Sequence, residues 1–335
     1  MSDLYIKIRI EAFLLTILFL SSCSSCVIDP EIVSVFGGEL AVPKYTGISV
    51  VSSSEVDLRF SGAVSVSAAE IVLQDSPDTI VPVTWEQDYR GTDIVFQLEK
   101  PIDIGASATI SVTVADSAGD SLSLVVPFIG FNDRVPALLI NEVRTVYAKP
   151  KVEYIELYIL EDGNLGGVEI YNAMNTVKPA YEFPAVEVSA GDYVVYHLRS
   201  IEEGVVDETD SLDASSGKDA SDNARDFWDT QTKAPLKKNN VVLVRERKDG
   251  RILDAFLCAE DSLTDWPSDT VVDAAAEAVT AGTWGPTSSV ADAVCSTGTT
   301  ATRTIGRDAE STDTNTAADW KICKTGKCSP GKVNN

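Results

Sequence analysis

The stretch from residue 138 to residue 160 contains two short runs of alternating apolar and polar positions, joined by a bend at Pro150. In the second run, Ile155, Leu157 and Ile159 fall on one face. The alternating positions Tyr154, Glu156 and Tyr158 fall on the other. Successive side chains of a β-strand point to opposite faces, so this pattern predicts a half-buried strand. Its acids would be solvated or bonded to backbone. The stretch therefore predicts the opening of a β-sandwich core and not a catalytic centre.

Residues 28–136 contain similar short runs, separated by small and polar residues. The alternation is clearest in residues 56–60, 81–85, 110–114 and 122–128. The last two runs flank residues 116–120, whose sequence Asp-Ser-Ala-Gly-Asp predicts a hairpin turn. Strand-sized runs about ten residues apart, with no long helical period, are typical of an immunoglobulin-like β-sandwich.

The pattern breaks at residues 132–136 and then resumes. Further strand-like runs occupy residues 164–171, 188–196, 241–244 and 251–256. Asp249-Gly250 suits a tight turn between the last two. We therefore expect an all-β fold of two tandem immunoglobulin-like β-sandwiches, at residues 37–136 and 137–335.

Two insertions interrupt the second predicted sandwich. The first, residues 202–229, holds ten acids against Lys218 and Arg225, and we expect a mobile loop whose Phe227 and Trp228 dock on the sandwich. A calcium loop is the alternative, although the Asp-x-Asp-x-Asp-Gly pattern is missing. The second insertion, residues 262–298, contains an alanine-rich run at 269–281 that predicts a short helix capped at its N-terminus.

The N-terminus predicts a secretion signal over residues 1–22. Lys7 and Arg9 precede a nine-residue apolar run at 12–20, about half of what a membrane-spanning helix requires. Leu20-Ser21-Ser22-Cys23 resembles the lipobox of bacterial lipoproteins. That resemblance implies that Cys23 carries acyl chains such as palmitate, which tether the mature protein to a membrane through residues 23–36. Cys26 would then be free, acylated or linked to another chain.

The second half of the chain resembles the lamin-tail domain of secreted bacterial proteins. The resemblance rests on the order of INEV, EYIELY, NLGGVEIY, EFPAVEVSAGDYVVY and VVLVRERKDGRILDAF, followed by ATRTIGRD, DTNTAADW and SPGKVNN. It covers residues 137–335 and implies an immunoglobulin-like sandwich that serves as a binding, scaffolding or appended module. Residues 165–168 lack the tryptophan common in that motif. VDLRFSGAV in the first half resembles bacterial immunoglobulin-like domains of surface proteins.

Composition narrows the possible partners. The chain carries 51 acids against 27 bases, a formal net charge of −24, which disfavours nucleic-acid binding because that affinity comes largely from Lys and Arg. Hydrophobic residues make up 44%, which excludes wholesale disorder. We therefore expect a folded protein. The predicted signal and the resemblance to a lipobox imply that it lies in the bacterial cell envelope, on its periplasmic or outer face. Its partners would be the membrane, through the lipid, and an envelope protein or glycan.

Candidate chemistry is sparse. His197 is the single histidine, and we assign it no role. In an oxidising compartment we expect two disulfides, Cys323–Cys328 and Cys258–Cys295, in preference to a zinc site. We expect no cofactor and no resident metal.

Two other functions stay open beside a non-catalytic binding or scaffold module. A hydrolase would use Glu153 and Glu156 with Glu142, although Glu153 and Glu156 point to opposite faces of a strand. A cation-dependent adhesin would use the acidic insertion. The sequence contains no Gly-rich phosphate loop, HExxH or GxSxG motif.

Overall fold

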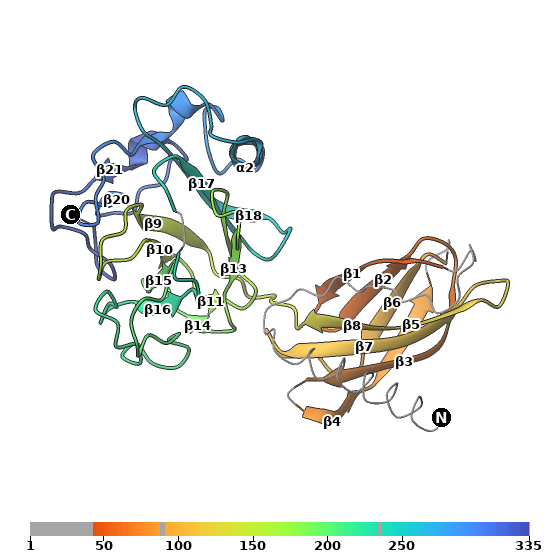
Figure 1. Cartoon of the computed structure of the whole chain (residues 1–335). Helices are drawn as coiled ribbons and strands as arrows, with labels where there is room; N and C mark the ends of the chain where they lie inside the picture. The colour runs from red at the N-terminus through yellow and green to blue at the C-terminus, as the bar shows by residue number, and fades with distance from the viewer. Residues whose placement is uncertain (1–42, 75, 88–90, 234–235, 335) are drawn as a thin grey trace, which may run out of the picture. The chain divides into compact units, whose positions relative to one another are not determined.

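The computed structural model describes residues 43–74, 76–87, 91–233 and 236–334, and Figure 1 traces them as ribbon. The predicted signal peptide, Cys23, Cys26 and the predicted tether at residues 23–36 lie outside the described residues. From Pro43 onward the chain forms one compact unit with two large hydrophobic cores. The first core uses residues 56–128 and the second uses residues 138–320. The predicted boundary between residues 136 and 137 falls between them.

The first sandwich consists of two four-stranded antiparallel sheets, ordered β1-β2-β6-β5 and β4-β3-β7-β8. Its strands are β1 (Tyr45–Ser52), β2 (Glu55–Phe60), β3 (Ser65–Leu73), β4 (Ser76–Val81), β5 (Val83–Gln87), β6 (Asp93–Leu98), β7 (Ser107–Ala115) and β8 (Ser121–Ile129).

The β7–β8 hairpin shows how the alternating sequence produces this sandwich. Every second residue of β7, from Ala108 to Val114, is buried, and the residues between them are serine and threonine. At the turn, Asp116 Oδ1 accepts the backbone N–H groups of Ala118 and Asp120, both at 2.9 Å. Gly119 supplies a backbone φ of +87°. The hairpin predicted from residues 110–128 is therefore confirmed.

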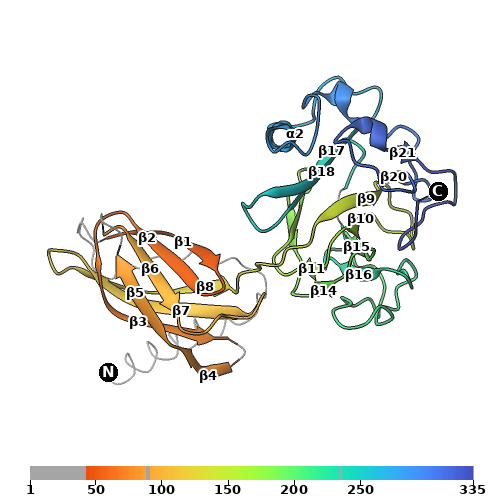
Figure 2. The same ribbon diagram turned by 180° about the vertical axis from the view of Figure 1, so that it is seen from behind.

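The second sandwich pairs a six-stranded sheet, ordered β16-β15-β10-β9-β20-β21, with a five-stranded sheet, ordered β13-β12-β17-β18-β19 (Figures 1 and 2). A two-stranded sheet, β11-β14, accompanies them. The strands are β9 (Leu138–Arg144), β10 (Tyr154–Ile159), β11 (Gly163–Asn164), β12 (Glu169–Asn172), β13 (Ala180–Glu182), β14 (Glu187–Val188), β15 (Tyr193–His197), β16 (Arg225–Trp228), β17 (Asn240–Arg245), β18 (Ile252–Ala259), β19 (Val294–Cys295), β20 (Ile305–Gly306) and β21 (Lys321–Ile322). The fold is thus all-β, with two sandwiches in tandem, as the sequence predicts.

Helix α2 (Asp269–Thr280) lies where the alanine-rich run predicts it and contacts β17 and β18 (Figure 1). Val271, Ala274 and Ala278 are buried, at the spacing of one helix face. Ser268 occupies the N-cap position, but its side chain forms no capping hydrogen bond. Two short 3₁₀ helices follow, η1 (Val290–Asp292) and η2 (Ala317–Asp319). Within the described residues no helix is long and apolar enough to cross a membrane.

Strand β10 departs from the prediction of a half-buried strand. Ile155, Leu157 and Ile159 face the core, but Tyr154 and Glu156 are also fully buried. The prediction of a half-buried strand is wrong here because two other segments cover the outer face, whereas Glu156 does bond to backbone, one of the two alternatives expected for its acids. The two covering segments are the acidic insertion at residues 202–229 and the tail, residues 329–334 near the C-terminus.

Candidate functional site

The covered face of the six-stranded sheet holds the densest group of ionisable side chains in the second sandwich. Glu142 and Arg144 come from β9, Tyr154 and Glu156 from β10, and His197 from β15, and all are at most 1% exposed. Strand register places Arg144 beside Tyr154, Tyr154 beside His197, and Glu142 beside Glu156. Because residues directly opposite each other in adjacent strands share a face, these side chains form one layer.

The carboxylates of Glu142 and Glu156 form the centre of this layer. Glu156 Oε1 accepts the Asn141 amide at 2.8 Å, and Oε2 accepts the backbone N–H of Gly331 at 2.6 Å. Burial, and then repulsion from Glu142, raises the pKa of Glu156 well above its usual range. Glu156 therefore holds its proton to higher pH than an exposed glutamate would.

The tail binds directly to this carboxylate pair. Glu142 accepts the backbone N–H of Ser329 at 3.0 Å and its hydroxyl at 3.1 Å. Asn334 donates its side-chain amide to the backbone carbonyl of Asn141 at 3.1 Å. Thr304 also donates its hydroxyl to Glu142. These contacts satisfy the buried carboxylates with donors from the protein itself.

The acidic insertion packs over the tail at Gly331. A Cβ added to Gly331 would lie 2.4 Å from Ser221 Oγ and 2.9 Å from Ala224 N, and the residue has a φ of +73°. Ser221 Oγ also donates to the carbonyl of Pro330 at 3.0 Å. Only glycine fits this position, because the backbone conformation and the space both exclude a side chain.

Arg144 joins the insertion to the sheet. Its guanidinium forms an ion pair with Asp219 of the insertion and donates to the Val152 carbonyl at 3.1 Å. It also lies 4.4 Å from the centre of the Tyr154 ring. Asp219 in turn accepts the backbone N–H of Val152 at 2.9 Å. The insertion is therefore fastened to the sheet by a buried ion pair.

His197 has a structural environment. Its Nε2 lies 2.7 Å from Asp226 Oδ1, and its ring stacks on Trp228 with centroids 3.7 Å apart. Asp226 also accepts the backbone N–H of Ser221 at 2.7 Å, while its own N–H donates to Glu208 at 2.8 Å. All of these groups are buried or nearly so, which leaves His197 without access to a substrate.

The acidic insertion differs from the loop that the sequence predicts. Its end forms β16, which pairs in parallel with β15 and places Phe227 and Trp228 in buried positions. Seven of its ten acids accept hydrogen bonds from backbone N–H groups or from side chains: Glu202, Asp207, Glu208, Asp213, Asp219, Asp226 and Asp229. The insertion is an ordered cover whose carboxylates largely bind the protein's own donors. Within the described part of the chain, no group of three or more His, Cys, Asp and Glu residues is placed to hold a metal ion.

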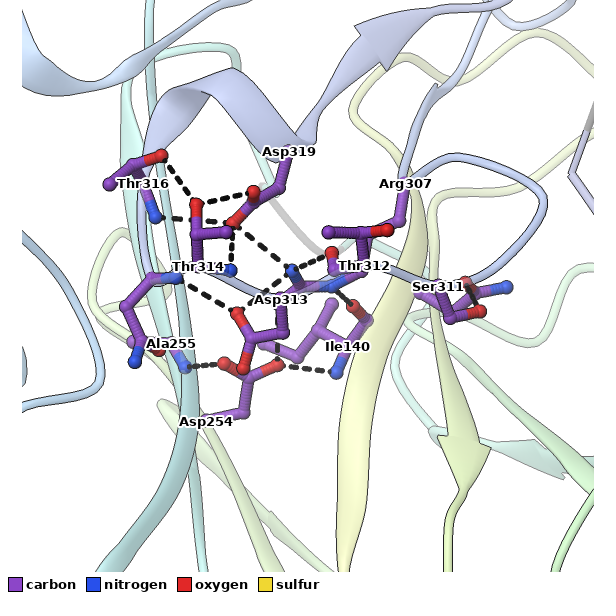
Figure 3. Close-up of polar contacts among 12 residues, drawn as sticks. Ile140, Asp254, Ala255, Arg307, Ser311, Thr312, Asp313, Thr314, Thr316 and Asp319 are labelled. Carbon is purple, nitrogen blue, oxygen red and sulfur yellow. Dashed lines mark hydrogen bonds and ion pairs between the residues drawn. The ribbon is translucent and has the colours of Figure 1, made fainter.

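A second buried charge network surrounds Arg307, directly after β20 (Figure 3). The guanidinium is 1% exposed and forms ion pairs with Asp254 at 3.2 Å, Asp313 at 3.0 Å and Asp319 at 3.5 Å. It also lies 4.5 Å from the centre of the Trp320 ring. The network fixes the segment after β20 against the sandwich.

Asp254 connects the two sheets of the second sandwich. From β18 it accepts the backbone N–H of Ile140 in β9 at 2.7 Å, as Figure 3 shows. It also accepts the N–H of Ala255 at 2.7 Å. Burial raises the pKa of Asp254 to about 7, although the charge of Arg307 opposes this shift. The contacts explain why an acid is retained inside this core.

The structure brings together two of the three hydrolase residues, Glu142 and Glu156, but not Glu153. Glu153 lies just before β10 and forms a two-point ion pair with Arg199, with its oxygens 2.7 Å and 2.5 Å from the guanidinium nitrogens. Glu142 and Glu156 do meet, but both bind the tail. Two carboxylates that hydrolyse a glycosidic bond need room for the sugar and the water between them. The pair is instead covered and fully engaged.

The four described cysteines are free thiols in the structure, so neither predicted disulfide is formed. Cys258 is buried, with a pKa raised by burial to about 12, whereas Cys295 is exposed. Register pairs Cys295 with Ala259, so the two thiols lie on opposite faces of the sheet. Bonding them would require local rearrangement. The Cys323 and Cys328 sulfurs are 3.9 Å apart, and that pairing stays a prediction.

A shallow groove of about 340 Å³ lies on the outward face of β3, β7 and β8 in the first sandwich. Small side chains dominate its lining, which includes Ala68, Glu70, Ser111, Thr113, Ser123 and Val125. Strands β7 and β8 contain no charged residue. Glu70 of β3 is the one charged residue in the lining.

Sequence reasoning missed the covered polar layer, although one signal for it exists. Two large polar residues alternate with apolar ones in each of the two runs: Glu142 and Arg144 in the first, Tyr154 and Glu156 in the second. When the runs pair as neighbouring strands, the like charges of Glu142 and Glu156 lie opposite each other, which is unfavourable unless other groups bind them. The glycine and serine of the final SPGKVNN segment are what allow the tail to approach closely.

Comparison with known proteins gives both a family and a relative. The model of the TP_1001_2nd family, described as "protein second domain", matches residues 136–322. A Treponema pallidum (strain Nichols) protein named "Uncharacterized protein" is 30% identical over 271 residues, which cover 73% of this chain and 69% of the relative.

Solved structures show only distant likeness. A DUF4876 family protein from Bacteroides thetaiotaomicron VPI-5482 has 11% identity and a TM-score of 0.29, over 78% of this chain and 88% of that one. The N-terminal part of the bacterial S-layer protein SbsC has 15% identity and a TM-score of 0.27, over 46% of this chain and 40% of that one. The family match spans more than half of the present chain, and the chain therefore belongs to the TP_1001_2nd family.

Proposed function

We propose that the protein is a non-catalytic module of the bacterial cell envelope, anchored by lipid at Cys23, that binds or scaffolds a protein or glycan partner. The observation that supports a non-catalytic protein is that the three candidate catalytic acids already bind other groups of the protein. Glu142 and Glu156 bind the tail, and Glu153 binds Arg199, so none of the three is free to activate water. The lipobox-like segment supports the envelope location. The lamin-tail resemblance supports an appended module.

The groove of the first sandwich is the surface we propose for the partner. Glu70 is the one charged residue in its lining, while β7 and β8 present hydroxyl groups and exposed Val125, so a partner has few charges to repel or desolvate there. Val125→Arg places a bulky charge in the groove without touching the core. It should abolish capture of the partner from native envelopes while leaving the melting temperature unchanged, with Thr109→Arg outside the groove lining as its control.

Substrate screening tests the non-catalytic part of the proposal. The full chain should show no turnover of glycoside, ester or peptide substrates above that of the Glu156→Gln variant. Reproducible turnover that Glu156→Gln or Glu153→Ala removes would establish the hydrolase instead.

Mass spectrometry tests the anchor. Protein extracted from its native envelope should carry acyl mass on an N-terminal Cys23, and Cys23→Ser should appear in the soluble fraction without it. An unmodified Cys23 in the native protein would disprove the lipid anchor.

Calcium binding tests the adhesin alternative. The insertion's acids mostly accept hydrogen bonds from the protein, so calcium titration should give no heat and no rise in melting temperature. A saturable heat with a higher melting temperature would favour the cation-dependent adhesin.

A further inference from the structure

We propose that Cys323 and Cys328 form a redox-active dithiol, and that its oxidation to a disulfide locks the tail onto the carboxylate pair of Glu142 and Glu156. Both thiols are partly exposed, whereas Cys258 is buried. Their sulfurs are 3.9 Å apart, so a disulfide needs only a small movement within the turn that joins them. The inference concerns control of the tail and does not depend on the partner proposed above.

The dithiol is part of the same hydrogen-bond network as the tail. The backbone N–H of Thr304 donates to Cys323 Sγ at 3.2 Å, and the Thr304 hydroxyl lies 3.2 Å from the same sulfur. That hydroxyl also donates to Glu142, which accepts Ser329. Cys328 immediately precedes Ser329. A change at the two sulfurs therefore affects Thr304, which donates to Glu142, and Ser329, which binds Glu142 from the tail.

The disulfide would restrict the tail where it leaves the sheet. Cys323 directly follows β21, the edge strand of the six-stranded sheet, and donates its N–H to the Thr304 carbonyl at 3.0 Å. In the dithiol form the tail is attached to this edge only through the 324–327 turn, in which Gly326 adopts a φ of +75°. A bond from Cys323 to Cys328 fixes the residue before Ser329 to the sheet and reduces the freedom of a detached tail.

The reaction is a thiol–disulfide exchange with an external disulfide, such as glutathione disulfide or the exchangeable disulfide of an envelope oxidoreductase. Either thiolate can make the first attack, and the overall balance is the same; in the order that begins with Cys328, its thiolate attacks the external disulfide. It bonds to one sulfur of the oxidant and releases the other as a thiol. The Cys323 thiolate then attacks Cys328 Sγ and releases the second thiol. Two protein thiols are oxidised and one external disulfide is reduced to two thiols.

Hydrogen exchange of the full chain in glutathione buffers of set ratio tests the inference. Peptide mapping should show a Cys323–Cys328 disulfide under oxidising buffer, with Cys258 remaining a thiol. Peptides covering residues 329–334 should then exchange about tenfold more slowly than in reducing buffer. Peptides from β7 and β8 of the first sandwich should exchange equally in both buffers.

Matched variants separate redox control of the tail from general oxidation. Cys295→Ser, which removes an exposed thiol away from the tail, should retain the difference between the two buffers. Cys323→Ser should remove it, and its tail should exchange at the rate of the reduced wild type in both buffers. Absence of the Cys323–Cys328 bond under oxidising buffer would overturn the proposal. So would a bond that forms without slowing tail exchange.

Discussion

Asp219→Asn tests whether the acidic insertion is fastened to the sheet by a buried charge. The substitution preserves the size of the side chain and removes its negative charge. The Arg144 guanidinium is 1% exposed and the Asp219 side chain 8% exposed, so water has little access to either. In the variant, the guanidinium stays buried without a carboxylate to balance its charge. Breaking one partner of a buried ion pair typically costs about 3–5 kcal/mol. The asparagine oxygen can still accept the Val152 N–H, so we expect a loss of about 3 kcal/mol.

Urea unfolding of the full chain, followed by tryptophan fluorescence, measures this loss. Trp228, Trp266, Trp284 and Trp320 lie in the second sandwich, and Trp85 alone lies in the first, so the signal reports mainly the relevant domain. Asp222→Asn is the matched control, because Asp222 is an exposed acid of the same insertion and should change stability by no more than about 0.5 kcal/mol.

A double variant distinguishes a lost ion pair from a local distortion. Arg144→Met combined with Asp219→Asn removes the uncompensated charge, so it should be more stable than Asp219→Asn alone. If Asp219→Asn unfolds within about 0.5 kcal/mol of the wild type, the insertion is not held by this ion pair and the reasoning is refuted.

Two further predictions concern the tail and the second charge network. Gly331→Ala should lower the free energy of unfolding by at least about 2 kcal/mol more than Gly326→Ala does. Both glycines have a positive φ, but of the two only Gly331 has neighbours within 3 Å of an added Cβ. Equal losses in urea unfolding would contradict the observed contact between tail and insertion. Burial raises the pKa of Asp254 from 3.8 to about 7, so between these pH values the folded state binds a proton that the unfolded state has lost. Its contribution to stability therefore falls as pH rises from about 4 to about 7, by up to about 4 kcal/mol, and Asp254→Asn should flatten that slope. An unchanged slope would show that Asp254 does not titrate in this range.

The alternation of apolar and polar residues predicted the strands well because each strand needs only one apolar face to join a core. Runs such as 110–114 and 122–128 became β7 and β8, and the alanine-rich run became α2. Those elements depend on residues close together in the sequence. The positions of their apolar side chains in the cores follow directly from that pattern.

The covered polar layer could not be predicted in the same way. The position of Glu156 in β10 is the same whether its outer face meets water or the tail, which is 175 residues away in sequence. Asp219 and Asp226 are indistinguishable by composition from the exposed Asp210 and Asp213 of the same insertion. Their burial depends on long-range contacts with Arg144 and His197. The stretch around residues 138–160 is therefore the centre of a polar core as well as of an apolar one.

Amide hydrogen exchange at Ser221, Ser329 and Gly331 tests most directly whether the insertion and the tail form an ordered cover over the carboxylate pair. Each of these N–H groups donates to a buried acid: Ser221 to Asp226, Ser329 to Glu142 and Gly331 to Glu156. Under reducing conditions, all three should exchange orders of magnitude more slowly than the exposed amides of the insertion. Exchange of the three at the rate of unstructured peptide would show that the face is open, and Glu142 and Glu156 would then be available for chemistry.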